Sequence, residues 1–208
     1  GMKQKNICIV KYLRNRIGGN MITTDDYIKF VSNPILPAEN KDEDLWFLFK
    51  DKMILIKSDK EKIQIPRFND VKEIIDGLEI KYNLGKLMNI QCFCGEINSA
   101  VEVSGKFKFI ALREVTAIID KEYAAVAGKA AQIIHFHKVS KYCGICGGKN
   151  EFVKSEFAMK CKECGYIVYP KVCPAIIVGI TKGDKILLAN NKNFPKGLHS
   201  VIAGFVDV

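Results

Sequence analysis

Tyr142-Cys143-Gly144-Ile145-Cys146-Gly147 and Cys161-Lys162-Glu163-Cys164-Gly165 are the stretches that decide the fold of this chain. In each, two residues separate a pair of cysteines, and a glycine follows the second cysteine. A tight turn of this length aims both sulfurs inward, and Zn²⁺ prefers four such ligands at tetrahedral angles. The glycines suit turns that need backbone angles most side chains resist. The spacing predicts a zinc ribbon with Zn²⁺ bound by Cys143, Cys146, Cys161 and Cys164, with disulfides or unconnected thiols as the alternatives.

The composition indicates a soluble globular protein. Of the 208 residues, 48% are apolar and 26% charged, which suffices for one or two domains with real cores beside a small metal module. No apolar run approaches the roughly 18 residues of a membrane-spanning helix, and residues 1–11 lack the pattern of a secretory signal. Because free thiolates for metal need a reducing compartment, we expect a cytoplasmic protein with no membrane partner.

Four cysteines lie outside the two pairs, and all four stand in apolar stretches: Cys8, Cys92, Cys94 and Cys173. They are predicted to be buried packing thiols. Cys92 and Cys94 share one face of an expected strand, so they are poor partners for each other, and a second metal site is the alternative for them.

The formal net charge of +9 is concentrated after residue 135. Four thiolates with one Zn²⁺ would reduce this local excess. Two interpretations stay open, namely lysines that keep the surface solvated and a basic patch that attracts phosphates.

The residues before the cysteine pairs predict a mixed α and β domain. Residues 45–49 and 53–56 flank a turn and favour a hairpin, residues 63–65 alternate like a third strand, and a short helix is expected over 70–77. Apolar residues then recur at intervals of three and four over 122–137, the pattern of an amphipathic helix leading into the ribbon. His135 and His137 lie on different faces of that helix and are expected to be polar or partly packed, not ligands.

After the ribbon the chain is predicted to be β. Residues 175–180 and 185–189 favour a hairpin around Gly183, and a final strand is expected over 199–206. A chain that ends on a core-like strand is expected to be cut. The fold class that follows is α+β.

Five stretches carry a family resemblance: Tyr142–Gly147, Glu156–Cys161, Tyr169–Lys171, Pro174–Val178 and Ser200–Val208. From Phe136 to Val208 the chain closely resembles the NADH pyrophosphatase branch of the Nudix hydrolases. Further upstream only scattered residues agree, such as Leu112-Arg113. The resemblance implies an N-terminal α+β domain over 1–138, a zinc ribbon over 139–171 and the first strands of an incomplete Nudix domain over 172–208, usually in a homodimer.

The resemblance fails at the Nudix box, whose glutamates hold Mg²⁺ or Mn²⁺. Only its first glycine, matched by Gly204, and the four residues after it are present. Hard carboxylate oxygens are needed to collect these ions and activate water. The resemblance therefore implies a parent enzyme that cleaves the diphosphate of NAD(H) to NMN(H) and AMP, and also allows NAD-capped RNA as a substrate. The chain itself has no catalytic residues of the box, and we expect it to be inactive alone.

Three residues match substrate-binding positions of the family. Phe205 matches an aromatic that stacks on the base, while Tyr169 and Ile177 match positions that line the same pocket. Each has a structural alternative: core packing for Phe205 and Ile177, and closure of the ribbon for Tyr169.

A non-catalytic module is the rival interpretation, with the ribbon binding nucleic acid or a protein partner. Phe152, Lys154, Phe157 and Lys160 interleave aromatic and basic side chains, as such a surface needs. A third interpretation is that the ribbon only joins the larger domains.

Overall fold

The computed structural model describes residues 30–35, 39–59, 62–78, 80–98, 101, 103 and 105–206. Backbone contacts divide the described residues into a larger unit, which ends at residue 170, and a smaller unit, which covers residues 171–206. Cys8, predicted to be a core thiol, lies outside the described residues.

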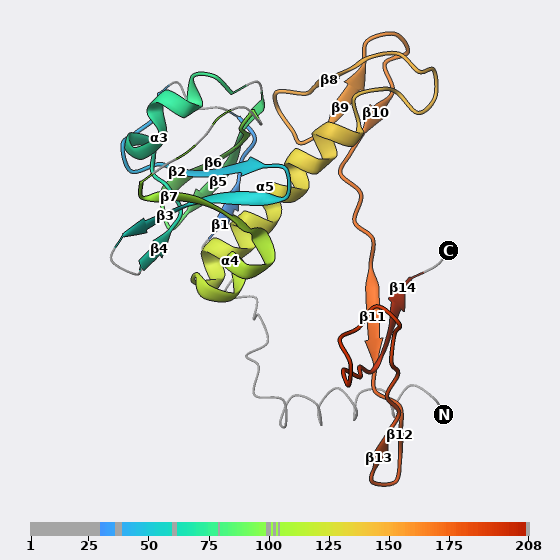
Figure 1. Ribbon diagram of the computed structural model, residues 1–208. Coiled ribbons are helices and arrows are strands. Elements are labelled where there is room, and N and C mark those ends of the chain that lie inside the picture. Colours follow the sequence, from blue (N-terminus) through green and yellow to red (C-terminus); the bar gives the residue numbers. More distant parts are fainter. Residues whose placement is uncertain are drawn as a thin grey trace. The chain divides into compact units, whose positions relative to one another are not determined.

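A seven-stranded mixed sheet forms the centre of the larger unit (Figure 1). In pairing order its strands are β1 (Phe30–Ser32), β5 (Ile80–Leu87), β6 (Ile90–Glu96), β2 (Leu45–Lys50), β3 (Met53–Asp59) and β4 (Lys62–Gln64), with β7 (Phe107–Ala111) paired to β3. β2 and β6 run parallel, and the remaining pairs of this sheet are antiparallel.

Strand β2 is buried on both faces, and its two faces meet different helices. Phe47 and Phe49 belong to the core cluster covered by α4 (Leu112–Ile118) and α5 (Lys121–Val139). Trp46 and Leu48 belong to the cluster on the side of α3 (Phe68–Ile75). Since side chains alternate along a strand, a strand covered on both faces is apolar throughout, as the sequence Leu-Trp-Phe-Leu-Phe is.

The secondary structure predicted for this unit is confirmed. β2 and β3 form the expected hairpin, β4 is the third strand, and α3 and α5 are the two helices. Asp51 takes a positive φ of 57° in the hairpin turn. In α5, Val126, Ala127, Ala130, Ile133 and Ile134 are buried, which is the apolar stripe the sequence indicated.

The ribbon follows α5 directly and belongs to the same unit. It is a three-stranded antiparallel sheet, in the order β10 (Ile167–Val168), β9 (Met159–Cys161) and β8 (Asn150–Phe152). Ala158 and Met159 are buried and form its small apolar centre.

Residues 171–206 form two separate strand pairs. β11 (Ala175–Val178) pairs with β14 (Ile202–Phe205), and β12 (Thr181–Lys182) pairs with β13 (Lys185–Ile186). The expected long hairpin of 175–180 with 185–189 is thus wrong in extent. β12 and β13 pair on either side of the turn at Gly183, which has a φ of 61°. β11 instead pairs with the last strand, β14.

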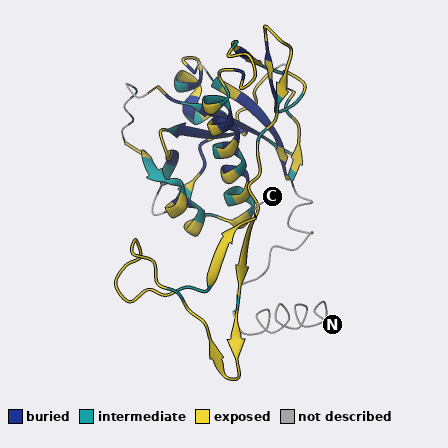
Figure 2. Cartoon of the chain, turned by 90° about the vertical axis from the view of Figure 1, so that its right-hand side faces the viewer, coloured by how far each residue is buried: buried dark blue, intermediate teal, exposed yellow. Residues whose placement is uncertain are grey.

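Figure 2 shows these residues as almost wholly exposed, whereas the sheet of the larger unit is largely buried. The prediction of a buried Cys173 is wrong, because the side chain is exposed next to strands with no covering layer among the described residues.

The fold class is α+β, as predicted: within the described ranges three helices accompany the mixed sheets, and a cysteine cluster is typical of a zinc ribbon. The domain boundaries at 138 and 171 stay a prediction. Among the described residues no helix combines the length and apolarity needed to cross a membrane.

Candidate metal centre

The two cysteine turns have the same backbone hydrogen bonds. In the first, the carbonyl of Cys143 accepts from the N–H of Gly147 at 3.0 Å, and the N–H of Cys143 donates to the carbonyl of Gly148 at 2.8 Å. In the second, Cys161 makes the equivalent bonds with Gly165 at 3.1 Å and Tyr166 at 2.8 Å.

Gly147 and Gly165 both have a φ of 74°, the left-handed region that glycine enters most easily. The sequence pattern Cys-x-x-Cys-Gly therefore encodes one turn geometry, used twice.

These turns bring four sulfurs together. The Sγ atoms of Cys143, Cys146, Cys161 and Cys164 all lie within 4.8 Å of one another. Two of the separations are 3.7 Å, from Cys143 to Cys164, and 3.5 Å, from Cys146 to Cys161. A tetrahedron with metal–sulfur bonds of about 2.3 Å has edges of about 3.8 Å. The spacing fits a tetrathiolate Zn²⁺ site and is too long for disulfides, and all four cysteines are free thiols.

Backbone N–H groups stabilise two of the thiolates. The N–H groups of Cys146 and Ile145 lower the pKa of Cys143 to about 7, and those of Cys164 and Glu163 lower the pKa of Cys161. The N–H of Gly148 acts likewise on Cys146, but the sulfurs of Cys164 and Cys161 raise the pKa of Cys146 to about 12. Thiolates this close repel one another, and a bound dication removes that repulsion. The donor set therefore suits Zn²⁺.

Gly148 is required where the two turns approach each other. A Cβ at this position would lie 2.5 Å from Cγ of Glu163 and 3.1 Å from Sγ of Cys161. Any side chain would push the second turn away from the first and separate the sulfurs.

Aromatic side chains join the ribbon to the sheet domain. The rings of Phe152 in β8 and Tyr82 in β5 have centroids 4.2 Å apart, and the Tyr82 hydroxyl shares a hydrogen bond with Nδ1 of His137. On α5, the ammonium of Lys129 lies 5.0 Å from the ring centroids of both Phe30 and Phe157. The ribbon thus packs on the sheet and on α5, and His137 is a packing residue, as expected.

Asn150 is a positioning residue that sequence reasoning missed. It is buried, its N–H donates to the carbonyl of Lys141 at 2.9 Å, and its side chain donates to the carbonyl of Ser140 at 2.9 Å. These bonds close the chain around the first turn. An asparagine between the two cysteine pairs, able to bond nearby backbone groups with its side chain, is the signal that could have pointed to it.

The remaining cysteines and histidines of the larger unit do not join the cluster. Cys92 and Cys94 lie in the core that faces α5, and burial raises the pKa of Cys92 to about 12 and that of Cys94 further. Both are protonated packing thiols, and within the described ranges no further group of histidine, cysteine or acidic side chains surrounds them. His135 is exposed on α5.

The three predicted substrate residues lie in different units. Tyr169 lies next to the last residue of the larger unit and is half exposed, and the carboxylate of Glu156 raises the pKa of its phenol. Phe205 and Ile177 lie in the smaller unit, 78% and 69% exposed. In the register of β11 and β14, Phe205 faces Ala175 and Ile177 faces Ala203, so Phe205 and Ile177 are diagonal neighbours on one face. Among the described residues neither is core.

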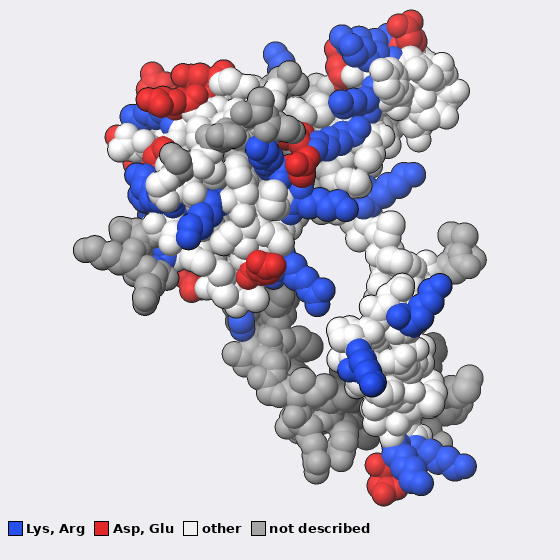
Figure 3. All heavy atoms as spheres, in the orientation of Figure 1, with Lys and Arg blue, Asp and Glu red and all other residues white. Residues whose placement is uncertain are grey.

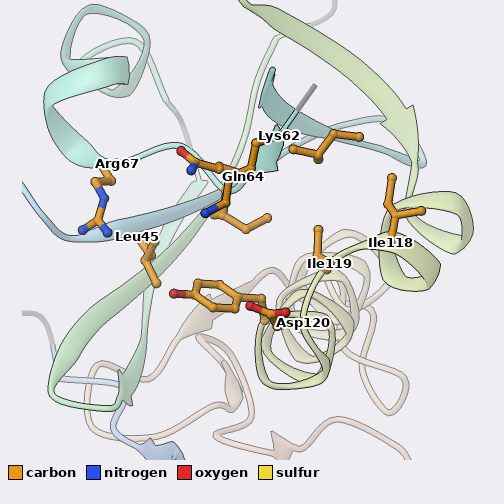
Figure 4. Close-up of a pocket in the computed structure, with 10 residues that line it drawn as sticks. Leu45, Lys62, Gln64, Arg67, Ile118, Ile119 and Asp120 are labelled. Atoms are coloured by element: carbon orange, nitrogen blue, oxygen red, sulfur yellow. The ribbon is translucent and has the colours of Figure 1, made fainter. Parts of the chain in front are cut away.

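A hollow of about 380 Å³ opens between β4, the turn before α3 and the start of α5 (Figure 4). Gln64 and Lys62 lie on one side and Asp120 on the other, so its charges are mixed. The guanidinium of Arg67 donates to the carbonyl of Glu43 at 2.9 Å. Among its described lining residues, no group of side chains could together hold a metal ion.

Two family models match the chain. An NADH pyrophosphatase-like rudimentary NUDIX domain matches residues 43–135, and an NADH pyrophosphatase zinc ribbon domain matches residues 140–169.

Curated relatives named NAD-capped RNA hydrolase NudC are similar over part of the chain. The relative from Haemophilus influenzae (strain PittEE) is 37% identical over 112 residues, 52% of this chain and 42% of the relative. That from Photobacterium profundum is 39% identical over 99 residues, 48% of this chain and 37% of the relative. That from Escherichia fergusonii is 41% identical over 90 residues, 43% of this chain and 35% of the relative. The matches thus span about two-fifths of the length of these relatives.

Proposed function

Because the chain belongs to the NADH pyrophosphatase family of Nudix hydrolases, through its rudimentary Nudix domain and its zinc ribbon, we propose that the whole protein hydrolyses the diphosphate of NAD(H). The products are NMN(H) and AMP. The observation that carries this proposal is the four-sulfur cluster, which stands in a ribbon of this one family and packs against the family's N-terminal domain.

Zn²⁺ has a structural role in this proposal. Cys143, Cys146, Cys161 and Cys164 would hold it, and four protein ligands leave no open position for substrate or water. The ion would fix the two turns relative to each other, while Phe152 packs the ribbon on Tyr82 of the sheet.

The substrate contacts come from residues on the surface. Phe205 would stack on a base and Ile177 would line the same side, since the two share a strand face and both are accessible. Tyr169, which is half exposed, is proposed as a further substrate contact because it matches a pocket position of the family. An exposed aromatic on a short strand is available for stacking in a way that a core aromatic is not.

Catalysis needs Mg²⁺ or Mn²⁺ held by carboxylates of the Nudix box. After Gly204 the 208 residues contain one acid, Asp207, and no glutamate. We therefore propose that the 208-residue polypeptide releases no AMP from NADH by itself, and that activity belongs to a protein that carries the box.

The test compares this polypeptide with the whole protein, both purified with zinc, in Mg²⁺ and NADH. AMP release by the whole protein alone is expected. Phe205→Ala should raise KM about tenfold or more, since base stacking contributes about 1–3 kcal/mol, while Val206→Ala, at the exposed residue directly after the same strand, should change it little. Whole protein that leaves NADH intact would refute the hydrolase, and AMP release by the short chain would refute its inactivity.

NAD-capped RNA is the second proposed substrate, supported by the names of the relatives and by the lysines of the ribbon. A phosphate backbone bound by lysines loses affinity steeply as salt rises. Raising salt from 50 to 200 mM should therefore reduce RNA processing far more than NADH hydrolysis. An equal response of the two substrates would contradict a role of the ribbon in holding RNA.

We also propose a cytoplasmic homodimer, since the seven described cysteines are free thiols and members of the family usually pair. The non-catalytic binding module stays a prediction with less support. Two of its four residues, Phe152 and Phe157, pack against the sheet domain and are only partly available to a ligand. A gel shift of the zinc-loaded chain, absent after chelation, would favour it.

A further inference from the structure

A larger hollow, of about 700 Å³, lies entirely within the larger unit and is distinct from the metal centre and from the predicted substrate residues. It is bounded by the β2–β3 turn, the start of α4 and the second half of α5. Its apolar walls come from Phe49, Leu112, Ala131 and Ile134. Phe49 and Ile134 are buried core residues, so these walls are held in place by the sheet domain.

The rim of this hollow is basic. Lys52, Arg113, His135 and Lys138 line it together with one acid, Asp51. Lys138 forms an ion pair with Glu96. Within the part of the chain that the structure describes, Lys52 and Arg113 make no ion pair, and both are exposed. Figure 3 shows Lys and Arg atoms in the region of α5 and on the ribbon, with some Asp and Glu atoms beside them in this view.

We propose that this hollow binds a nucleoside monophosphate, with the base against the apolar walls and the phosphate at Arg113 and Lys52. The cations converge from two different elements, the β2–β3 turn and α4, on one apolar space. A guanidinium donates two parallel hydrogen bonds to a phosphate, which gives the anion a defined place. The volume lies in the range of sites for ligands of this size.

The hollow should bind tightly only a ligand that has both an apolar base and a phosphate. A bare anion would leave the apolar walls wet, and a neutral apolar molecule would leave the cations unpaired. The hollow of Figure 4 provides the contrast, because there Asp120 lies across from Lys62 and Arg67 already donates to the backbone carbonyl of Glu43. That site does not select for an anion.

The experiment uses the 208-residue chain loaded with zinc and follows amide shifts by NMR during titration with AMP, ribose 5-phosphate, adenosine or laurate. AMP is expected to shift amides of residues 111–113 and 131–138, with ribose 5-phosphate and adenosine each binding at least tenfold more weakly. Because binding is the readout, loss of hydrolase activity does not affect the result.

Arg113→Ala is expected to weaken AMP binding about tenfold, the usual effect of losing a hydrogen bond to a charged group, and Lys52→Ala to weaken it further when combined. Lys62→Ala, in the other hollow, is the matched control and should leave the affinity unchanged. The proposal is overturned if AMP binds equally well without Arg113 and Lys52, if AMP shifts no amide of the hollow at millimolar concentration, or if laurate binds there more tightly than AMP.

Discussion

Apolar residues of the same kind are buried in the larger unit and exposed in residues 171–206. Ile56 in β3 is fully buried, while Ile177 in β11 is 69% exposed. The sheet of the larger unit has helices on both faces and a ribbon packed against it, whereas among the described residues β11 and β14 pair only with each other. A two-stranded pair is marginally stable in water at best. In this chain, strand pairing therefore does not by itself bury apolar side chains.

The metal provides the sharpest test of this difference. Removing Zn²⁺ with a chelator should unfold the ribbon, because four-thiolate sites contribute on the order of 10 kcal/mol to folding. The sheet and residues 171–206 should keep their signals, and Trp46, the single tryptophan, reports on the sheet. Cys161→Ser should reproduce the loss in NMR spectra and in zinc content.

Cys173→Ser is the control for this experiment, since Cys173 is an exposed free thiol outside the cluster. It should bind one zinc like the unchanged chain. Full zinc content in Cys161→Ser, or loss of zinc in Cys173→Ser, would contradict the assignment.

The next largest effect on stability is expected from one of two matched isoleucine-to-alanine substitutions. Ile56→Ala should destabilise the larger unit by about 2–5 kcal/mol, because it leaves a cavity in a closed core. Ile177→Ala should change stability by no more than about 0.5 kcal/mol. Urea unfolding followed by Trp46 fluorescence measures the first, and amide shifts of β11 and β14 the second. Equal effects would mean that residues 171–206 have a core of their own.

Two glycines allow a smaller comparison. Gly148→Ala should cost about 1–3 kcal/mol, since the added carbon meets Glu163 and Cys161. Gly204→Ala in β14 meets no atom within 4 Å and should be neutral. Thermal unfolding of the zinc-loaded variants distinguishes them, and a neutral Gly148→Ala would show that the two turns separate easily.

The smallest effect is a pH dependence at the joint between ribbon and sheet. Burial lowers the pKa of His137, Lys141 lowers it further and Glu96 acts in the opposite direction. The unfolded chain, with an imidazole pKa of about 6.5, therefore binds more protons than the folded one, and stability falls as the pH drops through this range.

His137→Gln should remove part of that acid sensitivity. His199→Gln, at an exposed loop in the smaller unit, should leave it unchanged. Unfolding midpoints between pH 5 and 7.5 give the comparison, and an unaltered slope in His137→Gln would assign the sensitivity elsewhere.

Local features of the fold were predictable because local patterns encode them. The cysteine spacing, the apolar stripe of α5 and the hairpin of β2 and β3 each follow from a few consecutive residues. β5 gave no clear pattern, because buried Asn83 interrupts it and the register shifts between Asn83 and Gly85.

Long-range contacts were not predictable from the sequence. The parallel pairing of β2 with β6, the choice of β14 as partner of β11 and the contact of Phe152 with Tyr82 join residues far apart along the chain. Cys173 was misassigned for the same reason, since an apolar stretch does not reveal whether a second layer covers it. At the candidate site the ligand set was predictable, but the anchoring role of Asn150 and the basic hollow depend on tertiary structure.

The continuous helix α5 carries Lys129 near its middle and leads straight to the first cysteine turn. One residue added or deleted in that interval would swing everything downstream by about 100° around the helix axis. Phe152 would then leave Tyr82, and Phe157 would leave Lys129. The length of the helix thus fixes the rotational position of the ribbon on the sheet domain. Insertions and deletions among natural homologues should therefore avoid residues 129–143 and accumulate in loops such as 191–197.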